Sequence, residues 1–369
     1  MATRITRTHL ALPIALLGGW MLVVTPARAA APEKVIDDKV EKVVKEETRD
    51  PGWVANIDLG ASFSLAHTDS VVGKLDGVTI TLGANISGGV SYTKGLHDWR
   101  SRLSINLAFT QSPVVDQFVK STDMFHFRTG YYIRAVDWVG PFVRFAMDTS
   151  MLPGYDVRAT ASDFQIAKLD GTTDNVTTSS LFQTDAFQPL TLKQSLGAFF
   201  RPYTTTEAAF EARVGLGARE VIAEGQLQTT DDKDTDTIIE VTELDDSHAV
   251  GAEIAVELEG SLEKGKVSYL LAAEVLIPFE ASQKPGDDRS LVDLTNVDFN
   301  AKISFKLVEW ASLDYDFRPT LQPQLVEDWQ IQNMLLLTFG YGFKYNEAEA
   351  AKEAEAAKKP EPPPADASE

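Results

Sequence analysis

The chain of 369 residues contains no cysteine, which excludes a disulfide framework and a metal site built on thiolates. It is also poor in basic charge, with 34 Lys and Arg against 54 Asp and Glu. The resulting formal net charge of −20 argues against a nucleic-acid-binding protein. Beyond the N-terminus there is no uninterrupted apolar run of about 18 residues, so a protein that crosses a membrane with helices is excluded.

The first residues have the features of a secretory signal. Arg4 and Arg7 form a basic start, residues 10–24 are apolar, and residues 27–29 (Ala-Arg-Ala) form a small-x-small cleavage site. We predict that residues 1–29 are a signal peptide and that the mature chain begins near Ala30. An uncleaved anchor is the alternative.

Two charged segments flank the central part of the chain. Residues 30–52 carry apolar residues at roughly helical spacing and predict a short amphipathic periplasmic linker. Residues 346–369 are rich in Ala, Glu, Lys and Pro and predict a disordered periplasmic tail. A contact of this tail with peptidoglycan or a periplasmic partner is the alternative.

Between these segments the hydrophobic period is two. The apolar side chains of Val78, Ile80 and Leu82 alternate with the polar or small side chains of Thr79, Thr81 and Gly83, for example. Such alternation indicates strands with one apolar and one polar face. We predict twelve strands, near 53–64, 78–91, 99–110, 122–135, 139–149, 190–201, 207–221, 249–260, 266–280, 293–307, 311–319 and 329–345.

Alternation does not say which face is wet, because a soluble β-sandwich or barrel alternates as well. The lengths of the connections favour a membrane barrel, because long connections alternate with short ones along the chain, as is typical of outer-membrane barrels. The large aromatic residues agree, because those with a polar edge favour the headgroup zone and cluster at the short-turn ends. They are Trp53, Tyr92, Trp99, Trp138, Tyr203, Trp310 and Tyr345.

The predicted fold is therefore all-β: a transmembrane antiparallel up-and-down β-barrel of about 12 strands over residues 53–345, with both termini in the periplasm. Ten or fourteen strands are the alternatives.

The last strand, LLLTFGYGFKY at 335–345, resembles the aromatic-ended assembly signal of bacterial outer-membrane proteins. Residues 98–110, 120–123 and 145–155 also resemble an uncharacterised family of bacterial outer-membrane barrels. The resemblance implies a location in the cell outer membrane, contact with its lipid and lipopolysaccharide, and insertion by the barrel-assembly machinery. It implies no particular activity.

The polar face carries charges that segregate along the chain. A basic wall is predicted from Arg100, Arg102, Arg128, Arg134, Arg144, Lys193 and Arg213, and an acidic wall from Glu253, Glu257, Glu259 and Glu274. In one interpretation the lumen is a passive or selective channel for small polar or anionic solutes, biased toward anions by the arginines. In the other, the charges pair and close the lumen of a structural or surface-interaction barrel.

We predict no enzyme, no cofactor and no metal. His126 is expected in the lumen near Asp123 and Arg128, but no nucleophile and acid can be assigned to it from spacing. The acidic stretch from Asp232 to Glu243 has the spacing of a calcium loop but lacks its glycine, so a solvated loop is favoured. Residues 150–189 form the longest connection, which we expect to constrict the lumen, cap its mouth or remain a mobile surface loop.

Overall fold

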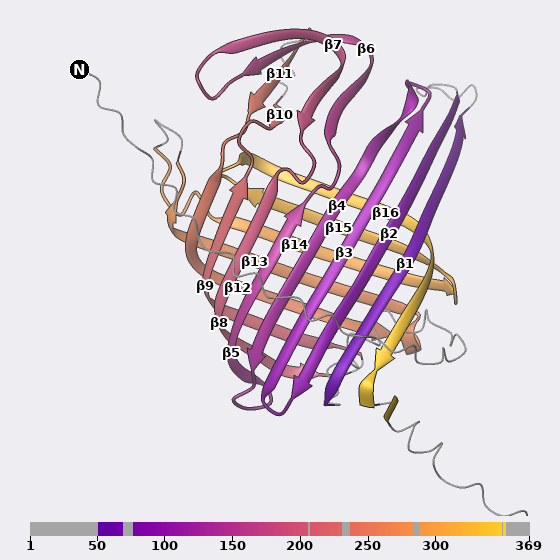
Figure 1. Ribbon diagram of the computed structural model, residues 1–369, viewed down its shortest axis with the longest axis vertical. Helices are drawn as coiled ribbons and strands as arrows, with labels where there is room; N and C mark the ends of the chain where they lie inside the picture. Colours follow the sequence, from indigo (N-terminus) through magenta and orange to yellow (C-terminus); the bar gives the residue numbers. More distant parts are fainter. Residues whose placement is uncertain are drawn as a thin grey trace, which may run out of the picture. The chain divides into compact units, whose positions relative to one another are not determined.

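The structure, a computed structural model, describes residues 51–68, 77–205, 207–230, 237–283, 288–348 and 350–351. Twelve of its strands form one closed barrel in which each strand pairs antiparallel with its neighbours, and β1 pairs with β16 (Figure 1). Their bounds are β1 Gly52–Thr68, β2 Gly77–Lys94, β3 His97–Ser112, β4 Val115–Ile133, β5 Val139–Thr149, β8 Leu190–Thr204, β9 Ala209–Ile222, β12 Ser247–Leu262, β13 Val267–Ala281, β14 Asn296–Val308, β15 Ala311–Gln322 and β16 Val326–Asn346.

This topology confirms the predicted antiparallel barrel, and each of the twelve predicted segments is one of its strands. The signal peptide 1–29, nearly all of the segment 30–52 and most of the tail 346–369 lie outside the described residues. Residues 232–236, at the start of the acidic stretch from Asp232 to Glu243, also lie outside them, whereas Ile238–Glu243 at its end form a strand. No helix in the described part of the chain is long and apolar enough to cross a membrane.

The apolar face of the barrel points outward. On β1, Ile57 and Leu59 are 45% and 44% exposed, while Asn56 and Asp58, between and beside them, line a cavity inside the barrel. On β16, Leu335 is 66% exposed. A continuous wall of exposed Leu, Ile, Val and Phe is unfavourable in water, because the free energy would be lowered if each of these side chains were transferred from water to an apolar environment. The outer surface therefore suits contact with lipid.

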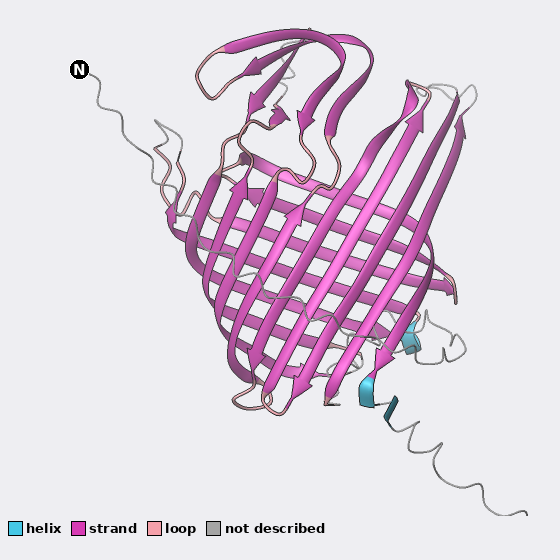
Figure 2. Cartoon of the chain, viewed as in Figure 1, coloured by secondary structure: helices cyan, strands magenta, loops and turns pink. Residues whose placement is uncertain are grey.

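The first strand of the barrel begins, and the last strand finishes, at the rim that carries the short turns, here called the short-turn end (Figure 2). These two positions are Gly52 and Asn346. The predicted aromatic cluster begins there, where the ring of Trp53 lies 4.8 Å from that of Tyr92 and 5.7 Å from that of Trp99. Trp329, near the start of β16, is an exposed tryptophan at the opposite end. The tryptophans thus favour one rim without being confined to it.

Two of the long connections form a second sheet at the opposite end of the barrel, here called the outer sheet (Figure 1). Its four strands run in the order β10, β11, β6, β7, and β11 pairs parallel with β6. The bounds are β6 Gly154–Ala167, β7 Thr173–Thr184, β10 Leu227–Thr229 and β11 Ile238–Glu243. Phe164, Ile166, Leu181, Ile239 and Val241 form its small buried core.

The outer sheet gives residues 150–189 a conformation that the sequence left open. This segment is mainly a strand hairpin stabilised by pairing with a distant segment, not a loop without regular structure. It was missed because β7 is rich in Thr and Ser and has only Leu181 buried, so its alternation is weak.

Candidate functional site: the barrel lumen

Like charges lie side by side on the inner face of the barrel. Arg102 of β3 is directly opposite Arg128 of β4, and Glu211 of β9 is opposite Glu257 of β12. Glu274 of β13 is likewise opposite Asp298 of β14. Because like charges at such positions repel each other, each wall needs opposite charge from another part of the barrel.

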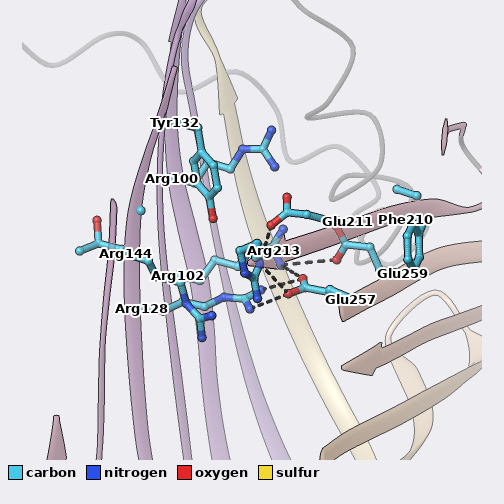
Figure 3. Close-up of a pocket in the computed structure, with 13 residues that line it drawn as sticks. Arg100, Arg102, Arg128, Tyr132, Arg144, Phe210, Glu211, Arg213, Glu257 and Glu259 are labelled. Carbon is cyan, nitrogen blue, oxygen red and sulfur yellow. Dashed lines mark hydrogen bonds and ion pairs between the residues drawn. The ribbon is translucent and has the colours of Figure 1, made fainter. Parts of the chain in front are cut away.

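That charge comes from across the lumen. Arg102 Nη1 lies 3.4 Å from Glu259 Oε2 and 3.8 Å from Glu257 Oε1. Arg128 Nη1 donates to Glu257 Oε2 at 3.2 Å, and Arg213 of β9 lies 3.7 Å from the same oxygen. Figure 3 shows the Arg102 and Arg128 guanidinium groups, which come from β3 and β4, extending toward the glutamates. The Glu257 carboxylate therefore accepts from Arg128 and forms longer ion pairs with Arg102 and Arg213.

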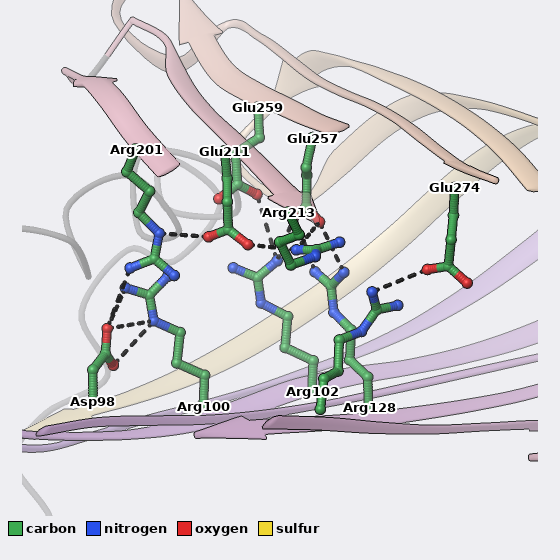
Figure 4. Close-up of polar contacts among 11 residues, drawn as sticks. Asp98, Arg100, Arg102, Arg128, Arg201, Glu211, Arg213, Glu257, Glu259 and Glu274 are labelled. Carbon is green, nitrogen blue, oxygen red and sulfur yellow. Dashed lines mark hydrogen bonds and ion pairs between the residues drawn. The ribbon is translucent and has the colours of Figure 1, made fainter. Parts of the chain in front are cut away.

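The network continues toward both ends of the barrel (Figure 4). At the short-turn end, the Asp98 carboxylate lies 2.6 Å from Arg100 and 3.4 Å from Arg201 of β8. Arg201 also donates to Glu211, which in turn accepts from Arg213. Each arginine thus has at least one carboxylate partner along this row.

Toward the other end, Arg144 of β5 donates to Glu274 at 3.0 Å. Arg219 of β9 lies 3.8 Å from the same carboxylate and forms an ion pair with Asp298. Lys193 of β8 pairs with Asp298 at 3.1 Å and with Asp148 at 3.7 Å. The basic and acidic walls are therefore joined over much of the barrel's length.

An aromatic cluster fills the lumen beside the network near the short-turn end. Tyr132, Phe142 and Phe199 are buried against one another on the inner faces of β4, β5 and β8. The Arg201 guanidinium lies 4.8 Å from the ring centres of both Tyr132 and Phe199, which is cation–π geometry. Side chains therefore fill the lumen beside β4, β5 and β8 near the short-turn end.

The structure brings most of the predicted wall residues into this network: Arg100, Arg102, Arg128, Arg144, Lys193, Arg213, Glu257, Glu259 and Glu274. Glu253 is buried on the inner face of β12, beside Gly217 of β9. Arg134 is placed differently, because it follows the end of β4 and donates to the Gly95 carbonyl in the neighbouring turn.

Several partners in the network lie outside the two walls predicted above, namely Asp98, Asp148, Arg201, Glu211, Arg219 and Asp298. One signal could have found two of them. Residues two apart on a strand share a face, so Asp98 with Arg100, and Glu211 with Arg213, form pairs that are visible in the sequence.

The other side of the lumen holds a polar cavity of about 240 Å³, here called the inner cavity. It is lined mainly by strands β1 to β3 and β13 to β15, and eight of its 22 lining residues are Asn or Ser, which carry amides or hydroxyls. These are Asn56, Asn85, Asn106, Asn300, Ser87, Ser104, Ser268 and Ser304. Arg102 and Glu259, which also line it, are paired with each other, and Asp314 accepts from Ser312 at 2.9 Å.

A second cavity of about 300 Å³, here called the outer cavity, lies nearer the outer sheet. Its lining includes five basic residues, Arg128, Arg144, Lys193, Arg213 and Arg318, and five acidic ones, Asp123, Asp148, Glu257, Glu274 and Asp298. Because these formal charges balance, the cavity has no net charge to attract ions of one sign.

The two cavities meet at four residues that line both, His126, Arg128, Asn300 and Arg318. His126 is held by Asp148 and Arg128 by Glu257, while Arg318 is held by Asp316 at 2.8 and 3.0 Å. No group of His, Asp or Glu residues suited to a metal ion occurs among the residues that the structure describes.

The fold and the lumen define a closed antiparallel barrel with an apolar outer surface and a charged, partly filled interior. No family model matches the sequence, and no curated protein matches it. The barrel is similar to the translocator domain of autotransporter NalP from Neisseria meningitidis, at 10% identity and TM-score 0.34, over 83% of this chain and 94% of that one.

It is also similar to an outer membrane channel from Pseudomonas putida F1, at 9% identity and TM-score 0.34, over 80% of this chain and 96% of that one. The P. putida toluene transporter TodX matches at 9% identity and TM-score 0.33, over 82% and 92%. With so few identical residues, the lumen has to be interpreted from its own side chains.

Proposed function

We propose that this protein is an outer-membrane channel for small polar solutes. The solutes pass through the inner cavity, along β1 to β3 and β13 to β15, and through the outer cavity, which is lined mainly by β4, β5, β8 and β13 to β16. The single observation that carries the proposal is the pair of adjoining polar cavities in the lumen, which share four lining residues. The exposed apolar wall supports a membrane location. The outer sheet then lies on the cell surface beside lipopolysaccharide, with the short turns and both termini in the periplasm.

The structure alters the expected basis of selectivity. Arg100, Arg102, Arg128 and Arg144 each have a carboxylate partner within 3.4 Å. An arginine whose charge is already neutralised adds little attraction for a passing anion. We therefore propose a channel with weak preference between anions and cations, in place of the anion bias expected from the sequence.

A structural barrel with a closed lumen is the second candidate. The observation that favours it is the ion network together with the Tyr132, Phe142 and Phe199 cluster, which fills the lumen beside β4, β5 and β8 near the short-turn end. In this case the outer sheet, rather than the lumen, would carry the function through contacts at the cell surface.

Single-channel recording of the full chain in a planar bilayer separates the two candidates. Steady openings with a reversal potential near zero in a salt gradient support the channel, and an electrically silent bilayer supports the closed barrel. The protein must first be shown to be folded, by a gel mobility that changes on boiling. Recovery in aqueous extract without detergent contradicts both candidates.

A further inference from the structure

We propose that Arg318 and Met124 form the narrowest point of the solute path, and that this constriction sets the size limit for uncharged, hydrogen-bonding solutes. This inference rests on the proposed channel function and names the class of solute that the channel admits.

The first argument is a contact that spans the lumen. Met124 lies on β4 and Arg318 on β15, which are not neighbours in the barrel. Even so, Arg318 Nη1 lies 2.7 Å from Met124 Sδ. A second contact lies beside it, where Thr122 Oγ1 of β4 is 3.6 Å from Met334 Sδ of β16. The side chains of β4 therefore touch those of β15 and β16 across the interior.

The second argument is that Arg318 is rigidly placed. Its Nε and Nη2 atoms donate to the two carboxylate oxygens of Asp316, two residues earlier on the same face of β15. A bidentate pair of this kind fixes both the position and the plane of the guanidinium group. Arg318 also lines both cavities, so a solute that moves between them passes its side chain.

The third argument concerns what the path offers to a solute. Other charged residues at the junction have partners, since Arg128 is paired with Glu257 and His126 with Asp148. An ion entering here would lose hydration without meeting an uncompensated opposite charge. Amides and hydroxyls such as those of Asn300 and Ser104 can instead exchange hydrogen bonds with hydroxyl or amide groups of a neutral solute. Sugars and other small polyols belong to this class.

The experiment measures single-channel conductance in KCl, and swelling of proteoliposomes in arabinose, glucose and sucrose, for the full chain and its variants. For Arg318→Ala we expect a roughly two-fold higher conductance and faster swelling in the larger sugars, because the path widens. Arg318→Met keeps the bulk of the side chain and should keep the wild-type size limit.

Arg158→Ala is the matched control. Arg158 donates to both carboxylate oxygens of Asp156 at 3.0 and 2.9 Å, in the same arrangement as Arg318 with Asp316, but it lies in the outer sheet. Its conductance should equal that of the wild type. If Arg318→Ala does not fold, as judged by gel mobility before and after boiling, Met124→Ala opens the same contact from the other side and should give the same increase.

The outcomes separate the two proposals. A silent wild-type protein overturns the channel function and the constriction with it. A wild-type channel whose conductance and sugar limit are unchanged by Arg318→Ala or Met124→Ala overturns the constriction alone. A channel that passes ions but excludes arabinose overturns the assignment of the solute class.

Discussion

Asp123 and Leu152 are joined by a hydrogen bond from the Leu152 backbone amide to Asp123 Oδ2, at 2.8 Å. The same carboxylate accepts from the Met151 amide at 2.9 Å, and Lys120 Nζ bridges Asp123 Oδ2 and the Leu152 carbonyl. These contacts connect β4 with the chain just before β6 enters the outer sheet.

We predict that Asp123→Ala loosens the base of the outer sheet by on the order of 2–3 kcal/mol, because it leaves two backbone amides without their charged acceptor. Hydrogen exchange at residues 150–152 should accelerate. Asp123→Asn keeps one acceptor oxygen and should have a smaller effect. Unchanged exchange in Asp123→Ala would show that the anchor contributes nothing.

Glu257→Ala is expected to destabilise the barrel by about 3–5 kcal/mol, because Arg102, Arg128 and Arg213 lose a shared buried counter-charge. The measurement is the temperature at which the folded form is lost on a gel. Glu220→Gln, on an exposed position of β9, is the control and should melt like the wild type. Adding Arg128→Ala to Glu257→Ala should recover part of the loss, whereas strictly additive effects would contradict the pairing.

Phe164→Ala should unfold the outer sheet while the barrel stays intact. Phe164 is 1% exposed at the centre of the small core, and such a truncation typically costs about 3–5 kcal/mol. Limited proteolysis should then cut the outer sheet without changing the heat-dependent gel mobility of the barrel. The exposed Phe182 of the same sheet is the matched position, and Phe182→Ala should remain resistant.

The absence of native cysteine allows the solute path to be mapped directly. A charged methanethiosulfonate added to Ser104→Cys should lower the conductance to roughly half, because Ser104 lines the inner cavity. Ser101→Cys, three residues earlier on the outward face of β3, should be unaffected. Block at the outward position, or none at Ser104, would place the path elsewhere.

The turn between β6 and β7 should be sensitive to acid. Hydrogen bonds from the Thr172 hydroxyl and backbone amide lower the pKa of Asp170 below its usual value of 3.8. A carboxyl whose pKa is lowered by folding stabilises the folded turn above its unfolded pKa, and that stabilisation disappears as the pH falls through the folded value. Protection of the Thr172 amide from exchange should therefore decrease below about pH 4. Asp170→Asn should remove this pH dependence.

The twelve barrel strands could be predicted because each of them separates a lipid-facing row from a lumen-facing row. Because lipid lies on one side of each strand and water on the other, apolar and polar residues must alternate along it. On β2 this places Val78, Ile80 and Leu82 on the outside and Thr79, Thr81 and Gly83 on the inside. The outer sheet has no such constraint. Its β7 is surrounded mainly by water, and β6 pairs with β11, which lies far away in the sequence.

The charged walls could be predicted from the parity of the positions, but their pairing could not. Arg102 and Glu259 meet because the register of the whole barrel places them at the same level along the barrel axis, on strands β3 and β12 that face each other across the lumen. Nothing local to either strand encodes that match. The same holds for Arg318 and Met124, whose contact depends on the number, spacing and register of the strands that lie between β4 and β15 around the barrel.

The adjacent like charges also have a consequence for how the protein is built. Arg102 and Arg128 belong to the first third of the strands, and their carboxylate partners on β12 come much later in the chain. In a sheet that is still open, Arg102 and Arg128 would lie side by side without these partners, whereas Glu257 would already have Arg213 on the neighbouring strand β9. Closure of the seam between β1 and β16 brings the cations and carboxylates together, so electrostatic attraction favours the closed barrel over the open sheet.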